Sequence, residues 1–140
     1  MSPEKIVVLK FGGSSLKDDS CLQRVISIIS DRIASGYKVV TVVSARGKTT
    51  ESLLSDAKNY APEGNPREFD MLLTTGERAS AALVAMALSS KGIPSISLTG
   101  SQAGIITDDN HTNARIIEIR PDRVFSALND GLTVIVGGFQ

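Results

Sequence analysis

Residues 7–15 read Val-Val-Leu-Lys-Phe-Gly-Gly-Ser-Ser, and this stretch decides the fold class. The apolar run is short, rich in β-branched residues and stopped by glycine, which predicts a buried strand. Gly12 and Gly13 let the backbone approach a ligand closely, and exposed N–H groups ahead of a helix form an anion site. Lys10 adds a positive charge at the carboxyl edge of the sheet, where open α/β sheets bind ligands, so the segment suits a phosphoryl group. A plain strand-to-helix turn with a solvated lysine explains the same residues equally well.

The rest of the chain predicts alternating strands and helices. Strands are expected at residues 5–10, 38–43, 95–98 and 133–136, and helices at 19–35, 50–60, 67–75, 77–91 and 121–129, with a pause at Gly76. Asp19 or Ser20 would cap the first helix, while Gly36 and Gly92 would end helices. Residues 104–107 and 115–119 form a short hairpin joined by the polar residues 108–113. The strand–helix–strand order implies right-handed crossovers and a parallel sheet.

Composition excludes several classes of function. The 140 residues suffice for one domain with a core, and 41% apolar and 21% charged residues are typical of a soluble globular protein. The 15 basic residues balance the 15 acidic ones, so no footprint for nucleic acid or a membrane surface exists. The apolar stretch 79–88 is too short to span a bilayer. Cys21 cannot form an internal disulfide, no zinc-type spacing or signal peptide is present, and we expect a cytoplasmic protein.

Familiar catalytic motifs are absent. Gly47-Lys48-Thr49 resembles the end of a P-loop, but Val42 stands where that motif requires glycine. One histidine and no G-x-S-x-G segment exclude a serine hydrolase of that type. His111 follows Asp108-Asp109-Asn110, which predicts a solvated hairpin tip rather than a metal site. Glu77 has two interpretations: an acidic residue favoured by a helix dipole, or a carboxylate for a substrate ammonium group.

Six segments occur in the order found in one enzyme family. They are Lys-Phe-Gly-Gly-Ser-Ser (10–15), Val-Val-Ser-Ala (42–45), Thr-Thr-Gly-Glu-Arg (74–78), Ser-Leu-Thr-Gly-Ser-Gln-Ala-Gly-Ile (97–105), Thr-Asp-Asp-Asn-His (107–111) and Val-Gly-Gly-Phe-Gln (136–140). Together they cover nearly the whole chain, which closely resembles the aspartokinases of the amino acid kinase family. The resemblance implies an α/β fold, a three-layer α/β/α sandwich with a mainly parallel sheet, of which residues 1–140 are the N-terminal, substrate-side half.

The resemblance also implies a reaction. Aspartokinases transfer the ATP γ-phosphoryl group to the β-carboxylate of L-aspartate, giving 4-phospho-L-aspartate, the first step toward lysine, threonine and methionine. ATP and Mg²⁺ are the implied cofactors, no residue of this chain is assigned to a metal, and a homo-oligomer is expected. Lys10 would contact the phosphates during transfer. The implied cradle is Gly12, Gly13 and Ser14, and the implied aspartate pocket is Ser44, Thr50, Glu77 and Phe139, with Glu77 on the amino group.

The chain departs from the family by omission. It lacks the Gly-Arg-Gly-Gly-Ser-Asp segment, whose Arg would hold the substrate α-carboxylate, most of the adenine and ribose site, and the ACT domains. Residues 1–140 alone are therefore expected to be inactive, with residues 133–136 as an unpaired edge strand. Two alternatives stay open. One is a related kinase acting on glutamate, carbamate or a nucleoside monophosphate, against which Gln102-Ala103-Gly104 and Gly76-Glu77 speak. The other is a noncatalytic amino-acid-binding or assembly module.

Overall fold

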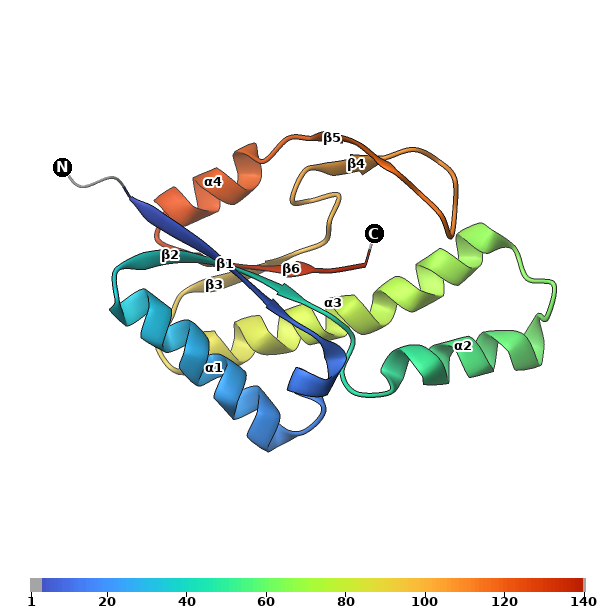
Figure 1. Ribbon diagram of the computed structural model, residues 1–140, viewed down its shortest axis with the longest axis horizontal. Coiled ribbons are helices and arrows are strands. Elements are labelled where there is room, and N and C mark those ends of the chain that lie inside the picture. Colours follow the sequence, from blue (N-terminus) through green and yellow to red (C-terminus); the bar gives the residue numbers. More distant parts are fainter. Residues whose placement is uncertain (1–3, 140) are drawn as a thin grey trace.

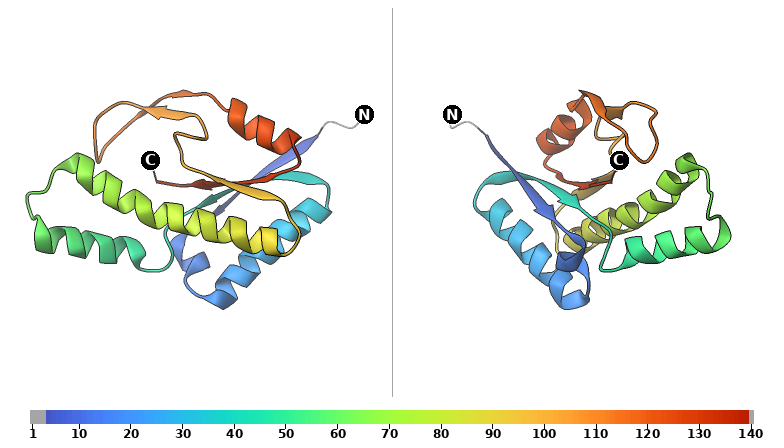
Figure 2. Two further views of the ribbon diagram at one scale, coloured as in Figure 1. Left: turned by 180° about the vertical axis from the view of Figure 1, so that it is seen from behind. Right: turned by 45° about the vertical axis from the view of Figure 1, so that its right-hand side comes forward.

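A four-stranded parallel sheet forms the centre of the molecule. The computed structural model describes residues 4–139. The strands are β1 (Lys5–Phe11), β2 (Tyr37–Val43), β3 (Ser95–Leu98) and β6 (Thr133–Gly137), and they are arranged in the order β1-β2-β6-β3 (Figure 1). Helices α1 (Asp19–Ala34) and α3 (Pro66–Ser90) lie on one side of the sheet and α4 (Asp122–Asn129) lies on the other (Figure 2). This arrangement confirms the predicted three-layer α/β/α architecture.

The core has two parts, one on each face of the sheet. Because side chains alternate along a strand, Val39 and Val43 of β2 face one side and Val40 faces the other. The first part packs α1 and α3 against the sheet, with Ile29, Leu88 and Ile135 fully buried. The second part packs Leu128 of α4 against β6 and β3, with partners that include Leu98, Val134 and Val136. Helices on both faces explain why the strands read as nearly continuous apolar runs.

The start of α1 differs by one residue from the prediction. Asp18, not Asp19 or Ser20, is the N-cap, and its Oδ1 accepts a hydrogen bond from the N–H of Cys21 at 2.8 Å. That hydrogen bond holds the pKa of the Asp18 carboxyl below its ordinary value. Gly36 follows the helix with a φ of +84°, the left-handed conformation that glycine adopts at low cost.

The predicted pause at Gly76 is wrong. Residues Pro66–Ser90 form one helix, α3, and Gly76 is buried near its middle. A Cβ on Gly76 would lie 2.9 Å from Cβ of Ala45 and 3.3 Å from Cγ2 of Thr49. The glycine therefore allows a close approach of two segments instead of ending the helix, a tertiary reason that local propensity does not show. Among residues 4–139, α3 is the one helix with the length and apolar composition to cross a membrane, but Val84 and Leu88 pack in the core.

The predicted edge position of the last strand is also wrong. β6 lies between β2 and β3, with Val40 paired to Val134 and Ile96 paired to the same residue from the other side. All five residues of β6 are buried. Helices cover β6 on both faces, since Ile135 packs with the core part under α1 and α3, and Val134 and Val136 pack with the part under α4. The edges are β1 and β3.

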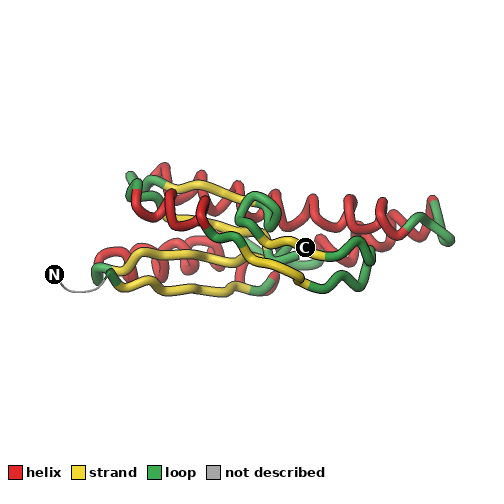
Figure 3. Tube along the Cα trace, turned by 90° about the horizontal axis from the view of Figure 1, so that it is seen from above, coloured by secondary structure: helices red, strands yellow, loops and turns green. Residues whose placement is uncertain are grey.

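Three further elements surround the sheet. A 3₁₀ turn, η1 (Gly13–Leu16), links β1 to α1. Helix α2 (Thr49–Tyr60) pairs with α3, and the two extend together beyond the sheet (Figure 3). The predicted hairpin is confirmed as β4 (Ile105–Thr107) and β5 (Ile116–Ile119), an antiparallel pair separate from the main sheet.

Candidate functional site

The carboxyl ends of the parallel strands gather several backbone turns at one edge of the sheet. Hydrogen bonds join these turns: the N–H of Ser44 donates to the carbonyl of Phe11 at 3.1 Å, and the N–H of Gly138 donates to the carbonyl of Val43 at 2.8 Å. The turns after β1, β2 and β6 are thus held side by side. Open α/β sheets bind their ligands at this edge, which makes it the place to look for a site.

Glu77 is the most informative side chain at this edge. It is only 8% exposed, and its Oε2 accepts a long hydrogen bond, 3.3 Å, from the N–H of Gly138. Within residues 4–139 no cation pairs with it. Because Glu77 lies in the middle of α3, attraction to a helix N-terminus does not explain it, and that interpretation is wrong. A buried carboxylate without a cation is costly, so this one is suited to a positively charged ligand group.

A cavity of about 110 Å³ lies beside Glu77. It brings together two of the predicted pocket residues, Glu77 and Phe139. It also has a lining that the site prediction did not include: Thr74, Arg78, Thr99, Gly100, Ser101 and Gly137. These residues supply hydroxyl groups and a guanidinium next to the carboxylate. Most belong to the segments 74–78 and 97–105, so the family resemblance of these segments is the signal that could have identified them.

Lys10 reaches the edge from the other face of the sheet. Lys10 is in register with Val42, Val42 with Val136, and Val136 with Leu98. Neighbours in register point to the same side of a sheet, so Lys10 lies on the α4 side with Val136 and Leu98. Its side chain is exposed, and no ion pair to it occurs in the part of the chain that the structure describes. Lys10 and Glu77 therefore approach the edge from opposite faces.

The three residues of the predicted phosphate cradle have different surroundings. A Cβ on Gly12 would meet nothing within 4 Å, so its backbone borders open space. A Cβ on Gly13 would lie 2.6 Å from the carbonyl oxygen of Ala45, so packing alone requires glycine there. Ser14 lines a separate cavity of about 210 Å³ that also contacts Phe11 and Cys21, away from Glu77. Cys21 is a free, half-buried cysteine.

Ser44 lies on the connection between β2 and α2, and Thr50 lies in the first turn of α2. Both are half-buried, and neither lines the cavity beside Glu77. The close contact of Gly76 with Ala45 nevertheless places this connection against the turn of α3 that carries Glu77. Ser44, Gly138 and Glu77 are therefore neighbours: the N–H of Gly138 donates to the carbonyl of Val43, which precedes Ser44, and also to the Glu77 carboxylate. Thr50 lies further along the chain, in α2.

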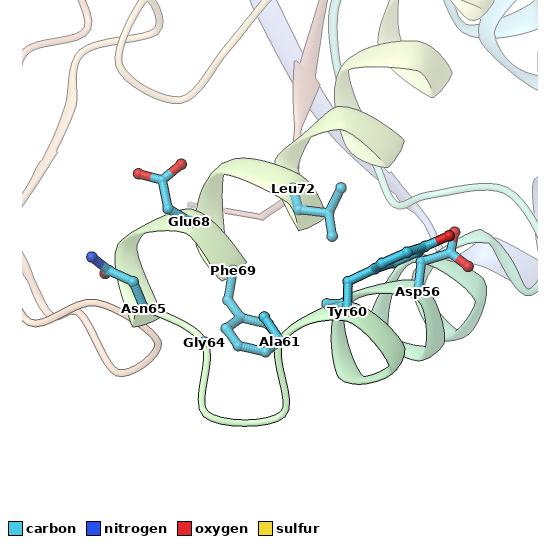
Figure 4. Close-up of a pocket in the computed structure, with 9 residues that line it drawn as sticks. Asp56, Tyr60, Ala61, Gly64, Asn65, Glu68, Phe69 and Leu72 are labelled. Atoms are coloured by element: carbon cyan, nitrogen blue, oxygen red, sulfur yellow. The ribbon is translucent and has the colours of Figure 1, made fainter.

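A larger cavity lies elsewhere. About 450 Å³ is enclosed between the far ends of α2 and α3, where Tyr60, Phe69 and Leu72 are prominent (Figure 4). Phe69 covers Gly64, since a Cβ on that glycine would lie 2.6 Å from the ring. This cavity is apolar and lies away from the strand ends, so it lacks the converging polar groups of a substrate site.

The described residues also contain no cluster of three potential metal ligands.

Comparison with known proteins identifies the family of this chain. The model of a family described as "Amino acid kinase family" matches residues 5–140. The chain belongs to the amino acid kinase family. Its curated relatives include aspartokinases from Mycolicibacterium smegmatis, 51% identical over 96% of this chain, and from Geobacillus stearothermophilus, 47% identical over 96%. Aspartokinase 1 of Bacillus subtilis is 45% identical over 97%.

Solved structures of the amino acid kinase family support the same fold. Aspartate kinase from Synechocystis is 41% identical over 96% of this chain, with a TM-score of 0.82. Escherichia coli aspartokinase III in complex with aspartate and ADP is 20% identical over 95% of the chain, with a TM-score of 0.76, which shows the shared fold. The chain spans only part of these proteins: 32% of the mycobacterial relative, 22% of the Synechocystis chain and 40% of the E. coli chain.

Proposed function

We propose that this chain is the N-terminal, substrate-side part of an aspartokinase. The whole protein would transfer the ATP γ-phosphoryl group to the β-carboxylate of L-aspartate and form 4-phospho-L-aspartate, the first step toward lysine, threonine and methionine. It would act in the cytoplasm, as a homo-oligomer. The observation that carries the proposal is the buried, cation-free carboxylate of Glu77 at the carboxyl edge of a parallel sheet. The 45–51% identity to aspartokinases supports the choice of amino acid.

The residues around the edge have complementary roles in this proposal. Glu77 would accept hydrogen bonds from the ammonium group of aspartate, in the cavity that Phe139 also lines. Ser44, from the β2–α2 connection, and Thr50, from the first turn of α2, would contact the same substrate. On the opposite face, Lys10 would place its ammonium group against the transferring phosphoryl group, whose charge redistributes during transfer. Positioning of the two substrates and neutralisation of charge are the main requirements of this reaction.

ATP and Mg²⁺ fit this edge to different extents. The open space beside Gly12 and the unpaired Lys10 suit a phosphate group, with Gly13 and Ser14 completing the turn. Because residues 4–139 contain no cluster of three metal ligands, Mg²⁺ would be held through the nucleotide phosphates and water. Bound there, the ion would neutralise phosphate charge.

The test is an acceptor screen with the full-length protein that contains this chain. ATP consumption is measured with L-aspartate, L-glutamate, carbamate and UMP, and the acyl phosphate is trapped with hydroxylamine. We expect turnover with L-aspartate alone. Preferred phosphorylation of another acceptor would identify a different kinase of the family.

The noncatalytic alternative needs a separate measurement. Calorimetry with L-aspartate, with and without ATP, detects binding that is not followed by turnover. Binding of aspartate to the full-length protein without any phosphorylation would establish a binding module instead. We also expect residues 1–140 alone to show no aspartate phosphorylation under the same conditions.

A further inference from the structure

The β4–β5 hairpin has few contacts that fix its position. It forms its own two-stranded sheet, and Ile116, Ile117 and Ile119 of its second strand are exposed. At its base the N–H of Arg120 donates to the carbonyl of Gly104 at 2.8 Å. An isolated two-stranded hairpin is marginally stable in water, so contacts at its tip decide where it lies.

One carboxylate on α3 holds that tip. Asp70 accepts hydrogen bonds from the N–H of Thr112, at 3.0 Å to Oδ2 and 3.2 Å to Oδ1. The Nδ1 of His111 lies 3.0 Å from the same Oδ2. Arg67, the nearest cation along α3, pairs with Glu68 instead. Asp70 is therefore committed to the hairpin, across 41 residues of sequence.

The backbone of the hairpin tip has the conformation that this contact requires. Thr112 has a φ of +66°, the one positive φ at a non-glycine residue within 4–139. Such a conformation persists only where its surroundings enforce it. Inside the loop, Oδ1 of Asp108 accepts hydrogen bonds from the N–H groups of Asn110 and Arg115, at 3.2 and 3.1 Å. The loop thus presents a backbone N–H and an imidazole together to Asp70.

The space under the hairpin adjoins the proposed amino-acid cavity. A cavity of about 230 Å³ lies between α3 and the hairpin, lined by Asp70, His111, Thr107 and Asp108 among others. Thr74 and Arg78 line both this cavity and the one beside Glu77. The hairpin is therefore one wall of a space that adjoins the cavity holding the Glu77 carboxylate, and Thr74 and Arg78 of α3 border both.

We propose that Asp70 anchors the β4–β5 hairpin through Thr112 and His111, and that His111 is a positioning residue which keeps the amino-acid cavity narrow enough to hold its substrate. The inference rests on the proposed function, because the substrate of that cavity is taken to be aspartate. Neither Asp70 nor His111 lines the small cavity itself. Their effect reaches it through Thr74 and Arg78, which lie under the hairpin and line both cavities.

The first experiment measures anchoring directly. Amide hydrogen exchange is followed at Thr112 and along residues 105–119 in the full-length protein and in Asp70→Ala. We expect exchange at Thr112 to accelerate about tenfold or more in the variant, the effect of losing charge-assisted hydrogen bonds. Asp109→Asn is the matched control, because Asp109 lies in the same loop, is exposed and makes no side-chain hydrogen bond in the described structure. Unchanged exchange at Thr112 in Asp70→Ala would overturn the anchoring.

The second experiment measures positioning. We expect His111→Ala to raise the KM for aspartate about fivefold or more, with kcat and the KM for ATP within about twofold of the starting protein, as for loss of a hydrogen bond that acts on one substrate. His111→Asn should restore most of the affinity, because its side-chain amide can donate to Asp70. A KM for aspartate that stays unchanged in His111→Ala and Asp70→Ala would overturn the positioning role.

The two proposals fail in different ways. If the unsubstituted protein phosphorylates another acceptor, the assignment to aspartate fails and the KM comparison is made with that acceptor. If it phosphorylates none, the positioning role falls with the proposed function. In either case exchange at Thr112 still decides whether Asp70 anchors the hairpin.

Discussion

Replacement of Glu77 by glutamine tests the central contact of the proposed site. The amide keeps the shape of the carboxylate and removes its charge. Glu77 is 8% exposed, so its interaction with a substrate ammonium group takes place largely out of water. A charge-assisted hydrogen bond in such surroundings contributes about 1.5–3 kcal/mol. We therefore expect the KM for aspartate to rise about 10- to 150-fold in Glu77→Gln, with the KM for ATP nearly unchanged.

The stability of the same variant separates a binding role from a structural one. The Glu77 carboxylate accepts a hydrogen bond from Gly138 N–H at 3.3 Å, and a glutamine oxygen can accept it as well. Removal of an unpaired buried charge also lowers the cost of desolvation. The free energy of unfolding should therefore stay within about 1 kcal/mol of its original value or rise.

The assay combines initial rates at varied aspartate and saturating ATP with urea denaturation of the same preparation. Glu63→Gln is the matched control, since Glu63 is exposed in the α2–α3 loop and undergoes the same chemical change. A KM for aspartate within about threefold of the original, which is less than about 0.7 kcal/mol, would refute the reasoning. So would an equal rise in the KM for ATP.

Four further predictions follow from individual residues. Lys10→Ala should lower kcat about 100-fold or more while leaving the KM for aspartate within about threefold, as expected when one preorganised charge is lost from the transition state; steady-state kinetics would count against the role if kcat stayed within about threefold. Thr41→Val should raise the free energy of unfolding by about 1–2 kcal/mol in urea titrations, because the hydroxyl of Thr41 is fully buried without a hydrogen-bond partner. Gly104→Ala should lower stability by about 2 kcal/mol or more, because φ is +87° and a Cβ would overlap the carbonyl of Arg120; a neutral effect would contradict the described turn. Asp18→Ala should lower Tm near neutral pH, and the difference in Tm between variant and original should narrow in acid. A carboxyl whose pKa is lowered by folding stabilises the fold above its unfolded pKa, and this stabilisation is lost as pH falls through its folded pKa.

Local sequence patterns predict most of the elements but not their arrangement. The strand over residues 5–10 and the stops at Gly36 and Gly92 are visible because apolar runs and glycines act locally, and both glycines have positive φ. The continuity of α3 through Gly76 is not visible, because the contact that explains the glycine is with Ala45 on another segment. Strand order is likewise a property of distant pairings, so the central place of β6 is not accessible from its own residues.

The site is predictable to a smaller degree. Family resemblance selects Glu77 and Phe139, which the structure brings to one cavity. Residue type and spacing alone leave Glu77 with two interpretations, and only its position in the middle of α3 removes one of them. The contact of His111 with Asp70 crosses 41 residues, and no short-range pattern reports such a pairing. The tip residues 109–113 are nevertheless exposed, as their polar sequence predicts.

The central position of β6 has a consequence during synthesis on the ribosome. The hydrogen-bonding edge of β2 that faces β6 is complete once Val43 has emerged, but its partner begins at Thr133. At about 5–20 residues per second, residues 44–132 take roughly 5–18 seconds to be made. Throughout that interval the edge of β2 and the apolar side chains of β3 lack their partner strand, β6. The nascent chain is therefore exposed to mispairing, and we expect chaperones to bind it. Among the described strands β6 is made last, and its pairing with β2 and β3 cannot form before it emerges.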